Sequence, residues 1–464
     1  MNTNTTKPGE ARLEDVRTVR NVLVAPPELH EDETVRDFFG TVVTPEEFAS
    51  EGFASRELVS GGLASGAVDP AGKSVYLCGD LSRVDVRGLR AAARVFVVRE
   101  LSQGYGDGEG GGDGEGGGER ERPWTVVGSG RVPLRVHGVG VYYRRFFEPD
   151  EDHVGRIRAE HVFQSLTEST KAGTALRTGI YLTPVTRDGD ALRFRLLRCS
   201  TNLSGPTENF GPTDTSLVEA LNAEAGTVFR NHAPLNHVLA QIYHNTGATP
   251  ERRQSKARIS AHADKTKDMP VDGVMAFCTF YEGLDALRPL PEDPFDLGVK
   301  GTSALTRLQF RLKEPGEEAP GVTVPGGEVP GGEVPAAGTE ERDTAAYPER
   351  FGLTLHPGSV FFMPLSTNRL YTHEIRPAAL DAAVLPTRLG YVVRCSGTEA
   401  VHRDGRTFLK APGGGLVPLE PPTREGMDEL RRLYAEENRS SAFVDYGDRF
   451  RFSMNTGDYG APRL

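Results

Sequence analysis

One short segment most constrains what this chain of 464 residues can fold into: residues 258–265, Arg-Ile-Ser-Ala-His-Ala-Asp-Lys. His262 and Asp264 are two positions apart, so on an extended strand both side chains point to the same side. A second histidine, His373, follows about a hundred residues later. Two neutral imidazole nitrogens and one carboxylate oxygen suit non-haem Fe(II) and leave the opposite face of the metal open. The spacing predicts a metal site made of these three side chains.

The sequence around His373 supports this interpretation, although a His-x-Asp pair alone also arises as an ordinary polar pair at a strand end. The apolar run at residues 359–364 is typical of a buried strand. Residues 387–394 alternate like a strand and place Arg388 and Arg394 on the same face. A permanently charged guanidinium within an apolar strand needs an anion, which a dicarboxylate cosubstrate would supply or an aspartate partner would replace.

Together these segments resemble the Fe(II)/2-oxoglutarate-dependent oxygenases, and within them the AlkB type, over residues 236–396. Residues 241–243, Gln-Ile-Tyr, are similar to the family's Asn-x-Tyr pair that contacts 2-oxoglutarate. The resemblance implies an iron set and a cosubstrate set. By this resemblance, His262, Asp264 and His373 would be the iron ligands. Arg388 and Tyr243 would bind the far carboxylate of 2-oxoglutarate. Arg394 and Gln241 would lie near its metal-bound end.

The resemblance also has departures that bear on the substrate. Gly390 and Val392 stand where the nucleic-acid repair members carry Asn and Thr, and Thr266 stands where they carry an acid that contacts the damaged base. The resemblance therefore implies an enzyme that uses Fe(II), 2-oxoglutarate and O2 to oxidise a C–H bond of a small molecule, releasing succinate and CO2. Lys265, Lys267 and Asp268 follow the metal segment and could contact a polar substrate or form a solvated loop.

Three alternatives stay open at this point. The first is an AlkB-like oxidative demethylase of nucleic acid or protein, which would need a basic groove. The second is a non-catalytic jelly-roll binding protein, which the intact ligands and Arg388 oppose. The third is a zinc hydrolase on the same three ligands, which gives no reason for Arg388.

The net charge and the cysteine content limit which binding partners and which cellular compartment we expect for this protein. The formal net charge is −11 and the sequence pI is about 5.6, so a nucleic-acid partner is not expected. The four cysteines are scattered without zinc spacing, which favours free thiols in a cytoplasmic protein. No signal peptide or membrane-length apolar run is apparent, so no membrane partner is expected. The sequence does not indicate an oligomeric state.

The expected fold is mainly β with flanking helices, a double-stranded β-helix (jelly-roll) core with an N-terminal α/β extension. An Asp-Gly turn at residues 188–190 predicts a hairpin between strands at 179–183 and 191–197. Apolar periodicity predicts strands at 273–281 and 306–313 and helices at 216–229 and 423–437. The expected divisions are a disordered start (1–15), the extension (16–150) with a flexible loop (103–122), the core (151–396) with a low-complexity insertion (314–342), and a helical tail (397–464).

Overall fold

The computed structural model describes residues 20–49, 70–83, 88–105, 124–167, 174–198, 203–314, 347–411 and 413–464. The segments expected to be disordered or flexible (1–15, 103–122 and 314–342) lie wholly or almost wholly outside these residues, as does Cys199.

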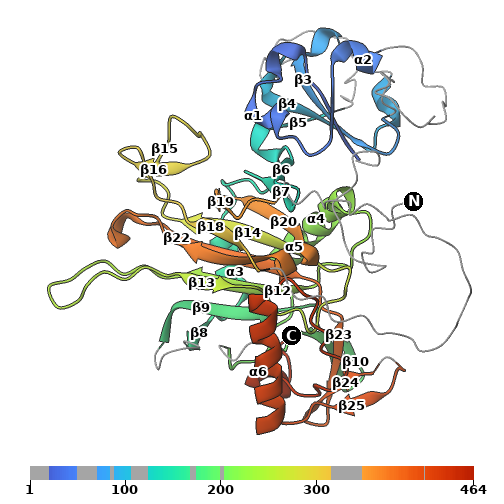
Figure 1. Ribbon diagram of the computed structural model, residues 1–464, viewed down its shortest axis with the longest axis vertical. Coiled ribbons are helices and arrows are strands. Elements are labelled where there is room, and N and C mark those ends of the chain that lie inside the picture. Colours follow the sequence, from blue (N-terminus) through green and yellow to red (C-terminus); the bar gives the residue numbers. More distant parts are fainter. Residues whose placement is uncertain are drawn as a thin grey trace, which may run out of the picture.

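The N-terminal extension folds as a parallel five-stranded sheet in the order β2-β1-β3-β4-β5 and forms the lobe at the top of Figure 1. Apolar side chains alternate along its strands and are buried on both faces, as a covered parallel sheet requires. The α/β extension is therefore confirmed. Its elements are β1 (Asn21–Val24), β2 (Thr41–Val43), β3 (Ser74–Asp80), β4 (Arg94–Gln103), β5 (Thr125–Val127), α1 (Glu33–Arg36), α2 (Pro45–Ala49) and the 3-10 turns η2 (Pro27–Leu29), η3 (Leu81–Arg83), η4 (Gly88–Ala91) and η5 (Ser129–Arg131).

The core is built on an eight-stranded antiparallel sheet in the order β6-β7-β20-β14-β22-β12-β9-β8. Two of these strands, β6 and β7, precede residue 151, so the sheet extends beyond the expected core. The strands are β6 (Leu134–Val136), β7 (Gly140–Tyr143), β8 (Gln164–Thr167), β9 (Thr174–Leu182), β12 (His237–Tyr243), β14 (Val274–Glu282), β20 (Ser359–Pro364) and β22 (Thr387–Arg394).

A four-stranded antiparallel sheet faces the larger one, in the order β13-β21-β18-β19. Its strands are β13 (Ile259–His262), β18 (Arg307–Leu312), β19 (Arg350–Thr354) and β21 (Tyr371–Arg376). Met275, Phe277 and Phe361 of the large sheet pack with Phe310 and Tyr371 of the small one. The mainly β fold with a double-stranded β-helix core is therefore confirmed.

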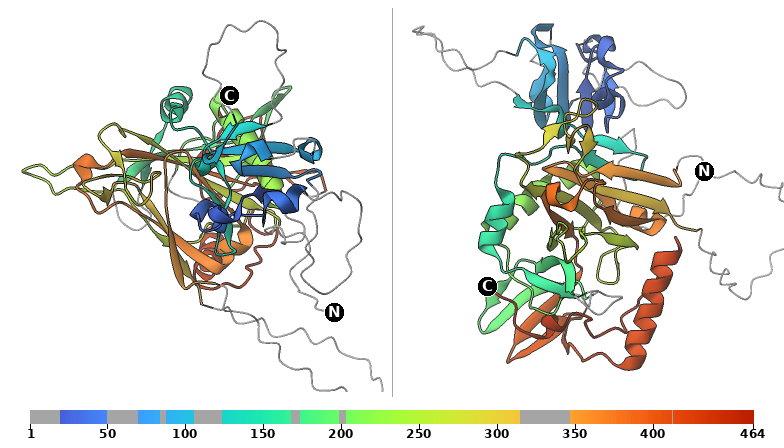
Figure 2. Two further views of the ribbon diagram at one scale, coloured as in Figure 1. Left: turned by 90° about the horizontal axis from the view of Figure 1, so that it is seen from above. Right: turned by 90° about the vertical axis from the view of Figure 1, so that its left-hand side faces the viewer.

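Helices cover the outer face of the large sheet and connect its strands (Figures 1 and 2). Ile157 of α3 and Leu221 of α4 are fully buried in one apolar cluster with that face. These helices are α3 (His153–Glu160) and α4 (Pro212–Val228). A further helix, α5 (Leu365–Leu370), lies between β20 and β21, and its Leu365 packs in the cluster between the two sheets. The expected helix at 216–229 begins earlier, at Pro212, because proline is favoured in the first turn. The carboxylate of Asp214 in that turn accepts from the N–H of Gly211, the residue just before the helix, and so caps it.

The two faces of β22 have different partners. Leu389, Tyr391 and Val393 join the cluster on the helix side, whereas Val392 packs with the residues between the two sheets. Because side chains alternate along a strand, Arg388 and Arg394 share the face of Val392. Both arginines therefore lie on the inner face of the barrel.

The region after residue 396 contains strands as well as the expected helix. Three of them extend a third sheet, in the order β10-β11-β23-β24-β25. Asp404 and Gly405 both have positive φ (50° and 70°), the geometry of a tight hairpin turn between β23 and β24. The elements are β10 (Thr186–Asp188), β11 (Ala191–Leu196), β23 (Thr398–Arg403), β24 (Arg406–Lys410), β25 (Leu416–Pro418), α6 (Arg424–Arg439) and η8 (Thr456–Tyr459).

The remaining elements form a small three-stranded sheet and one turn: β15 (Arg288–Pro289), β16 (Leu297–Val299), β17 (Thr302–Ser303) and η7 (Ala382–Val384). No helix in the described part of the chain is long and apolar enough to cross a membrane.

Candidate metal and cosubstrate site

The structure brings His262, Asp264 and His373 together at the open edge of the small sheet. His262 and His373 are direct partners across β13 and β21, with their ring centroids 4.5 Å apart. The Nε2 of His262 lies 3.9 Å from Oδ1 of Asp264. One ligand atom from each of the three side chains lies within 4.8 Å of the others, which is close enough to hold one metal ion.

Both histidines are held in the neutral form that a metal ligand needs. The Nδ1 of His262 lies 2.9 Å from the carbonyl oxygen of Ser260, which accepts its proton and leaves the lone pair on Nε2. Burial, together with the neighbouring His262, lowers the pKa of His373 to about 3. Partial burial also lowers the pKa of His262, whose side chain keeps 33% of its surface exposed.

The third candidate ligand, Asp264, is held in its ionised form by Arg394. Burial alone would raise the pKa of this carboxyl, but the charge of Arg394 and the two imidazoles bring it to about 2. The Nη2 of Arg394 donates to Oδ1 and Oδ2 at 2.9 and 3.0 Å, and its Nε donates to Oδ2 at 3.1 Å. Arg394 therefore orients the carboxylate through a charged two-pronged contact.

Arg388 is buried without an anion. It is 3% exposed, and its Nε and Nη1 have no hydrogen-bond partner among the described residues. Its guanidinium lies over the ring of Tyr243, 4.6 Å from the centroid. Gly390 leaves room for this stack, because a Cβ there would lie 3.0 Å from Nη2 of Arg388 and 3.1 Å from Cε2 of Tyr243. A buried cation with two unpaired donors fits a carboxylate ligand.

The two other residues expected at the cosubstrate, Tyr243 and Gln241, lie on the same face of β12 and next to β22. The hydroxyl of Tyr243 donates to Oε1 of Gln241 at 3.3 Å. All seven residues singled out from the sequence are thus on or beside the inner faces of the two sheets. Neutral imidazoles, an ionised carboxylate and an unpaired guanidinium fit a divalent metal and a dicarboxylate.

Several residues that sequence reasoning missed also belong to this region. Thr279 on β14 is opposite Gly390, fully buried, and its hydroxyl has no partner among the described residues. The side-chain amide of Asn368 binds the main chain of Asp264 on both sides, each time at 2.9 Å. A hydroxyl inside the apolar run 273–281 was a visible signal for Thr279. Asn368 stood in the segment that contains His373, but its spacing gave no sign of this contact.

Two of the charged residues that follow Asp264, namely Lys267 and Asp268, do not face a substrate. Asp268 accepts from the backbone N–H and the guanidinium of Arg198 and from Nζ of Lys267, at 2.5–3.1 Å. These cations lower the pKa of Asp268 strongly despite its burial. The idea that Lys267 and Asp268 contact a substrate is therefore wrong, because both side chains are buried in this network.

A second group with metal-ligand chemistry, Glu160, His161 and Asp214, lies on the outer side of the large sheet. Both ring nitrogens of His161 are already paired, Nε2 with Asp214 at 2.6 Å and Nδ1 with Glu208 at 3.2 Å. The hydroxyl of Tyr391 donates to the other oxygen of Asp214 at 2.7 Å. These contacts make the group a structural ion-pair network that joins α4 to the back of β22.

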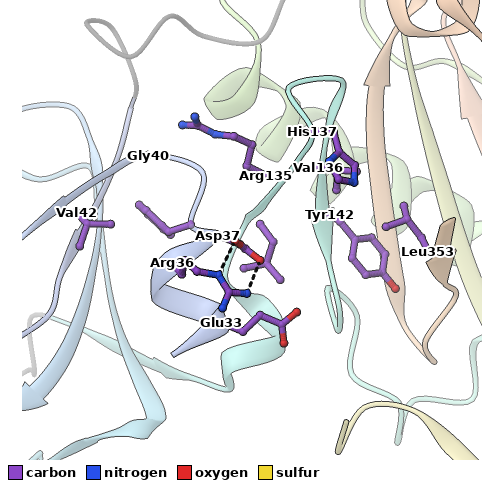
Figure 3. Close-up of a pocket in the computed structure, with 12 residues that line it drawn as sticks. Glu33, Arg36, Asp37, Gly40, Val42, Arg135, Val136, His137, Tyr142 and Leu353 are labelled. Carbon is purple, nitrogen blue, oxygen red and sulfur yellow. Dashed lines mark hydrogen bonds and ion pairs between the residues drawn. The ribbon is translucent and has the colours of Figure 1, made fainter. Parts of the chain in front are cut away.

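One groove lies elsewhere, between the N-terminal lobe and the core (Figure 3). It has a volume of about 580 Å³ and includes the adjacent ion pair of Arg36 with Asp37, at 3.2 Å. None of the seven candidate residues lines it.

Comparison with solved structures gives distant matches to this chain. No family model and no curated protein matches the chain. The epimerase SnoN, solved in complex with Fe3+, alpha-ketoglutarate and nogalamycin RO, is 14% identical, with 62% of this chain and 92% of that chain covered and a TM-score of 0.30. A second SnoN structure, described as a non-heme alpha-ketoglutarate-dependent epimerase from nogalamycin biosynthesis, is 15% identical over 62% and 91%, with a TM-score of 0.25.

A third match is the Fe(II)/alpha-ketoglutarate-dependent dioxygenase TqaL, at 12% identity, 57% and 78% coverage and a TM-score of 0.21. The chain is thus distantly similar in structure to enzymes of this kind. Identities and TM-scores this low do not assign a function.

Proposed function

We propose that this protein is an Fe(II)- and 2-oxoglutarate-dependent oxygenase that oxidises a C–H bond of a small molecule. One observation carries the proposal: a metal-competent His-Asp-His group and a buried arginine without an anion occur on the facing sheets of one barrel. A zinc hydrolase would use the first feature and leave the second unexplained. A jelly-roll binding protein would need neither.

The chain's own residues would divide the work as follows. His262, His373 and Asp264 would hold the metal, with Arg394 orienting the carboxylate. Arg388 would bind the far carboxylate of 2-oxoglutarate, and the stacked Tyr243 ring would keep water from that ion pair, which strengthens it. When bound, iron, 2-oxoglutarate and O2 would supply an oxidative decarboxylation in which one oxygen atom goes to succinate and the other oxidises the substrate, with release of CO2.

A small-molecule substrate is supported by charge and by the residue at position 266. The net charge of −11 disfavours a polyanionic partner. Thr266 donates its hydroxyl to Glu437, so its side chain is engaged within the protein. The AlkB-like subtype and a cytoplasmic location stay predictions from the sequence. The three described cysteines are free and buried, in keeping with a reducing compartment.

Succinate formation tests the proposal. Purified protein is incubated with Fe(II), ascorbate, 2-oxoglutarate and O2, beside a His262→Ala control. We expect succinate from the wild type and none from the variant, since the variant lacks one of three ligands. Anaerobic addition of 2-oxoglutarate to the Fe(II) form should give a visible metal-to-ligand charge-transfer band. No band and no succinate would refute the oxygenase assignment.

The substrate class has its own test. Small metabolites and methylated oligonucleotides are compared as stimulators of succinate formation. Stimulation by a metabolite supports the proposal, whereas stimulation by methylated oligonucleotides alone would establish the demethylase alternative.

A further inference from the structure

The segment that carries two of the three metal ligands is held by a helix from beyond the barrel. The Oδ1 of Asn438, in the last turn of α6, accepts from the backbone N–H of Ala263 at 2.6 Å. Ala263 is the residue between His262 and Asp264 and is fully buried. The contact joins residues 175 positions apart in the chain.

The neighbouring residue on α6 makes a second contact with the same segment. Glu437 is 3% exposed, and its Oε1 accepts from the backbone N–H of Thr266 at 3.2 Å and from the hydroxyl of Thr266. Its other oxygen accepts from the hydroxyl of Tyr446 at 2.6 Å. Oε1 of Glu437 thus fixes α6 against the residues that follow Asp264, while the hydroxyl of Tyr446 holds the other oxygen.

Asn368 holds the same segment from the other side, through the N–H and the carbonyl of Asp264. Lys313, directly after β18, links Asn368 to α6. Its Nζ donates to the carbonyl of Asn368 at 2.9 Å and to that of Glu437 at 2.7 Å. The carbonyl of Glu437 belongs to the last turn of α6, where no intrahelical donor is available. A buried lysine therefore completes the helix end and links it to the barrel.

These contacts fix the backbone of residues 263–266 at four points. A His-x-Asp segment that ends an edge strand would otherwise be free to move, and among the described strands β13 pairs with one neighbour, β21. A ligand pair held in place before the metal arrives loses less conformational entropy on binding. Groups that orient metal ligands in this way typically contribute about 10–100-fold to metal affinity.

We propose that α6 is a positioning element of the metal site, with Asn438 fixing the main chain between His262 and Asp264 for metal binding. This inference rests on the proposed function, since it concerns the same three ligands. Asn438 does not touch the metal ligands' donor atoms; it acts through the backbone of Ala263.

The chain offers a closely matched control in Asn222 on α4. Its Oδ1 accepts from the backbone N–H of Leu235 at 2.8 Å, and its Nδ2 donates four residues back to the carbonyl of Val218 at 3.0 Å. Asn438 has the same pair of contacts, with its Nδ2 donating to the carbonyl of Tyr434 at 3.0 Å. Asn222 makes one further contact, from its Nδ2 to the carbonyl of Leu235 at 2.9 Å, and the two asparagines hold different segments.

The experiment is Co(II) binding to the full chain, followed by the visible d–d absorption of the bound ion, with His262→Ala defining the site. We expect Asn438→Ala to bind Co(II) about tenfold more weakly than wild type and with a changed band shape. Asn438→Asp keeps the acceptor and should recover most of the affinity. Asn222→Ala should lose a similar amount of thermal stability and bind Co(II) as the wild type does.

Each other outcome overturns the inference. Equal Co(II) affinities of wild type and Asn438→Ala would overturn the inference and leave the proposed function standing. The same holds if Asn222→Ala or Asn438→Asp weakens Co(II) binding as much as Asn438→Ala does. Absence of His262-dependent Co(II) binding in the wild type would overturn the proposed function as well. If Asn438→Ala does not fold, the isosteric Thr266→Val, which removes only the hydroxyl contact with Glu437, should still weaken Co(II) binding; unchanged affinity there refutes the inference.

Discussion

Replacing Arg388 with methionine should stabilise the metal-free protein while removing its response to 2-oxoglutarate. The buried Nε and Nη1 groups have no partner among the described residues. Each unsatisfied buried donor costs about 1–3 kcal/mol, so the pair costs about 2–6 kcal/mol. The stack on Tyr243, at 4.6 Å, returns about 0.5–2 kcal/mol. Arg388→Met therefore should raise the free energy of unfolding by about 3 kcal/mol, the difference between the midpoints of these two ranges.

The assay is urea unfolding of the chelator-treated protein and of the Mn(II)-loaded protein, each with and without 2-oxoglutarate. At a ligand concentration of 100 times Kd, binding adds about 2.7 kcal/mol to the wild type. The variant should gain nothing, because it lacks the guanidinium that we propose to bind the far carboxylate.

Arg198→Met serves as the matched control, since Arg198 is equally buried but fully paired with Asp268 and with the carbonyl of Phe450. Losing one partner of such a buried pair should cost about 3–5 kcal/mol. The reasoning is refuted if Arg388→Met destabilises the metal-free protein as Arg198→Met does.

Three further predictions follow from other residues. Gly390→Ala places a Cβ 3.0 Å from Nη2 of Arg388, so it should weaken 2-oxoglutarate binding about tenfold in a calorimetric titration, with Co(II) affinity unchanged as the check that the metal ligands are intact. Tyr391→Phe removes a donor to buried Asp214 and should lower the free energy of unfolding by about 1–3 kcal/mol; an unchanged midpoint would contradict this. Burial raises the pKa of Asp458 from 3.8 to about 7. A carboxyl with a raised pKa stabilises the folded state most below pH 3.8, so the free energy of unfolding should fall by up to about 4 kcal/mol as the pH rises to 7. Asp458→Asn should flatten that slope in urea titrations.

The sequence predicted the barrel because its strands carry strong local signals. The apolar runs at 273–281 and 359–364 are strands β14 and β20. Alternation placed Arg388 and Arg394 on one face, and the structure has them there. The pairing of His262 with His373 across β13 and β21 could also be anticipated, because the three ligand types suggested a shared metal.

Strand partners that depend on distant residues could not be predicted. The Asp-Gly turn exists, but it joins β10 to β11, and β9 pairs with β12 and β8. The other edge of β11 pairs with β23, some two hundred residues later. A turn signal fixes where the chain reverses, whereas the partner of each strand is set by burial of the whole sheet. The contacts of Asn438 and Glu437 with the metal segment were invisible for the same reason.

The contact between α6 and Ala263 also orders events during synthesis. All strands of the two core sheets have left the ribosome once residue 394 has emerged, and domains generally fold as they appear. Asn438 follows more than forty residues later. A nascent barrel would therefore present His262, Asp264 and His373 while Asn368 alone holds the main chain around Asp264, so a chain arrested before α6 should be folded but poorly loaded with metal. Tight metal binding by the nascent protein would then indicate that residue 438 has been translated.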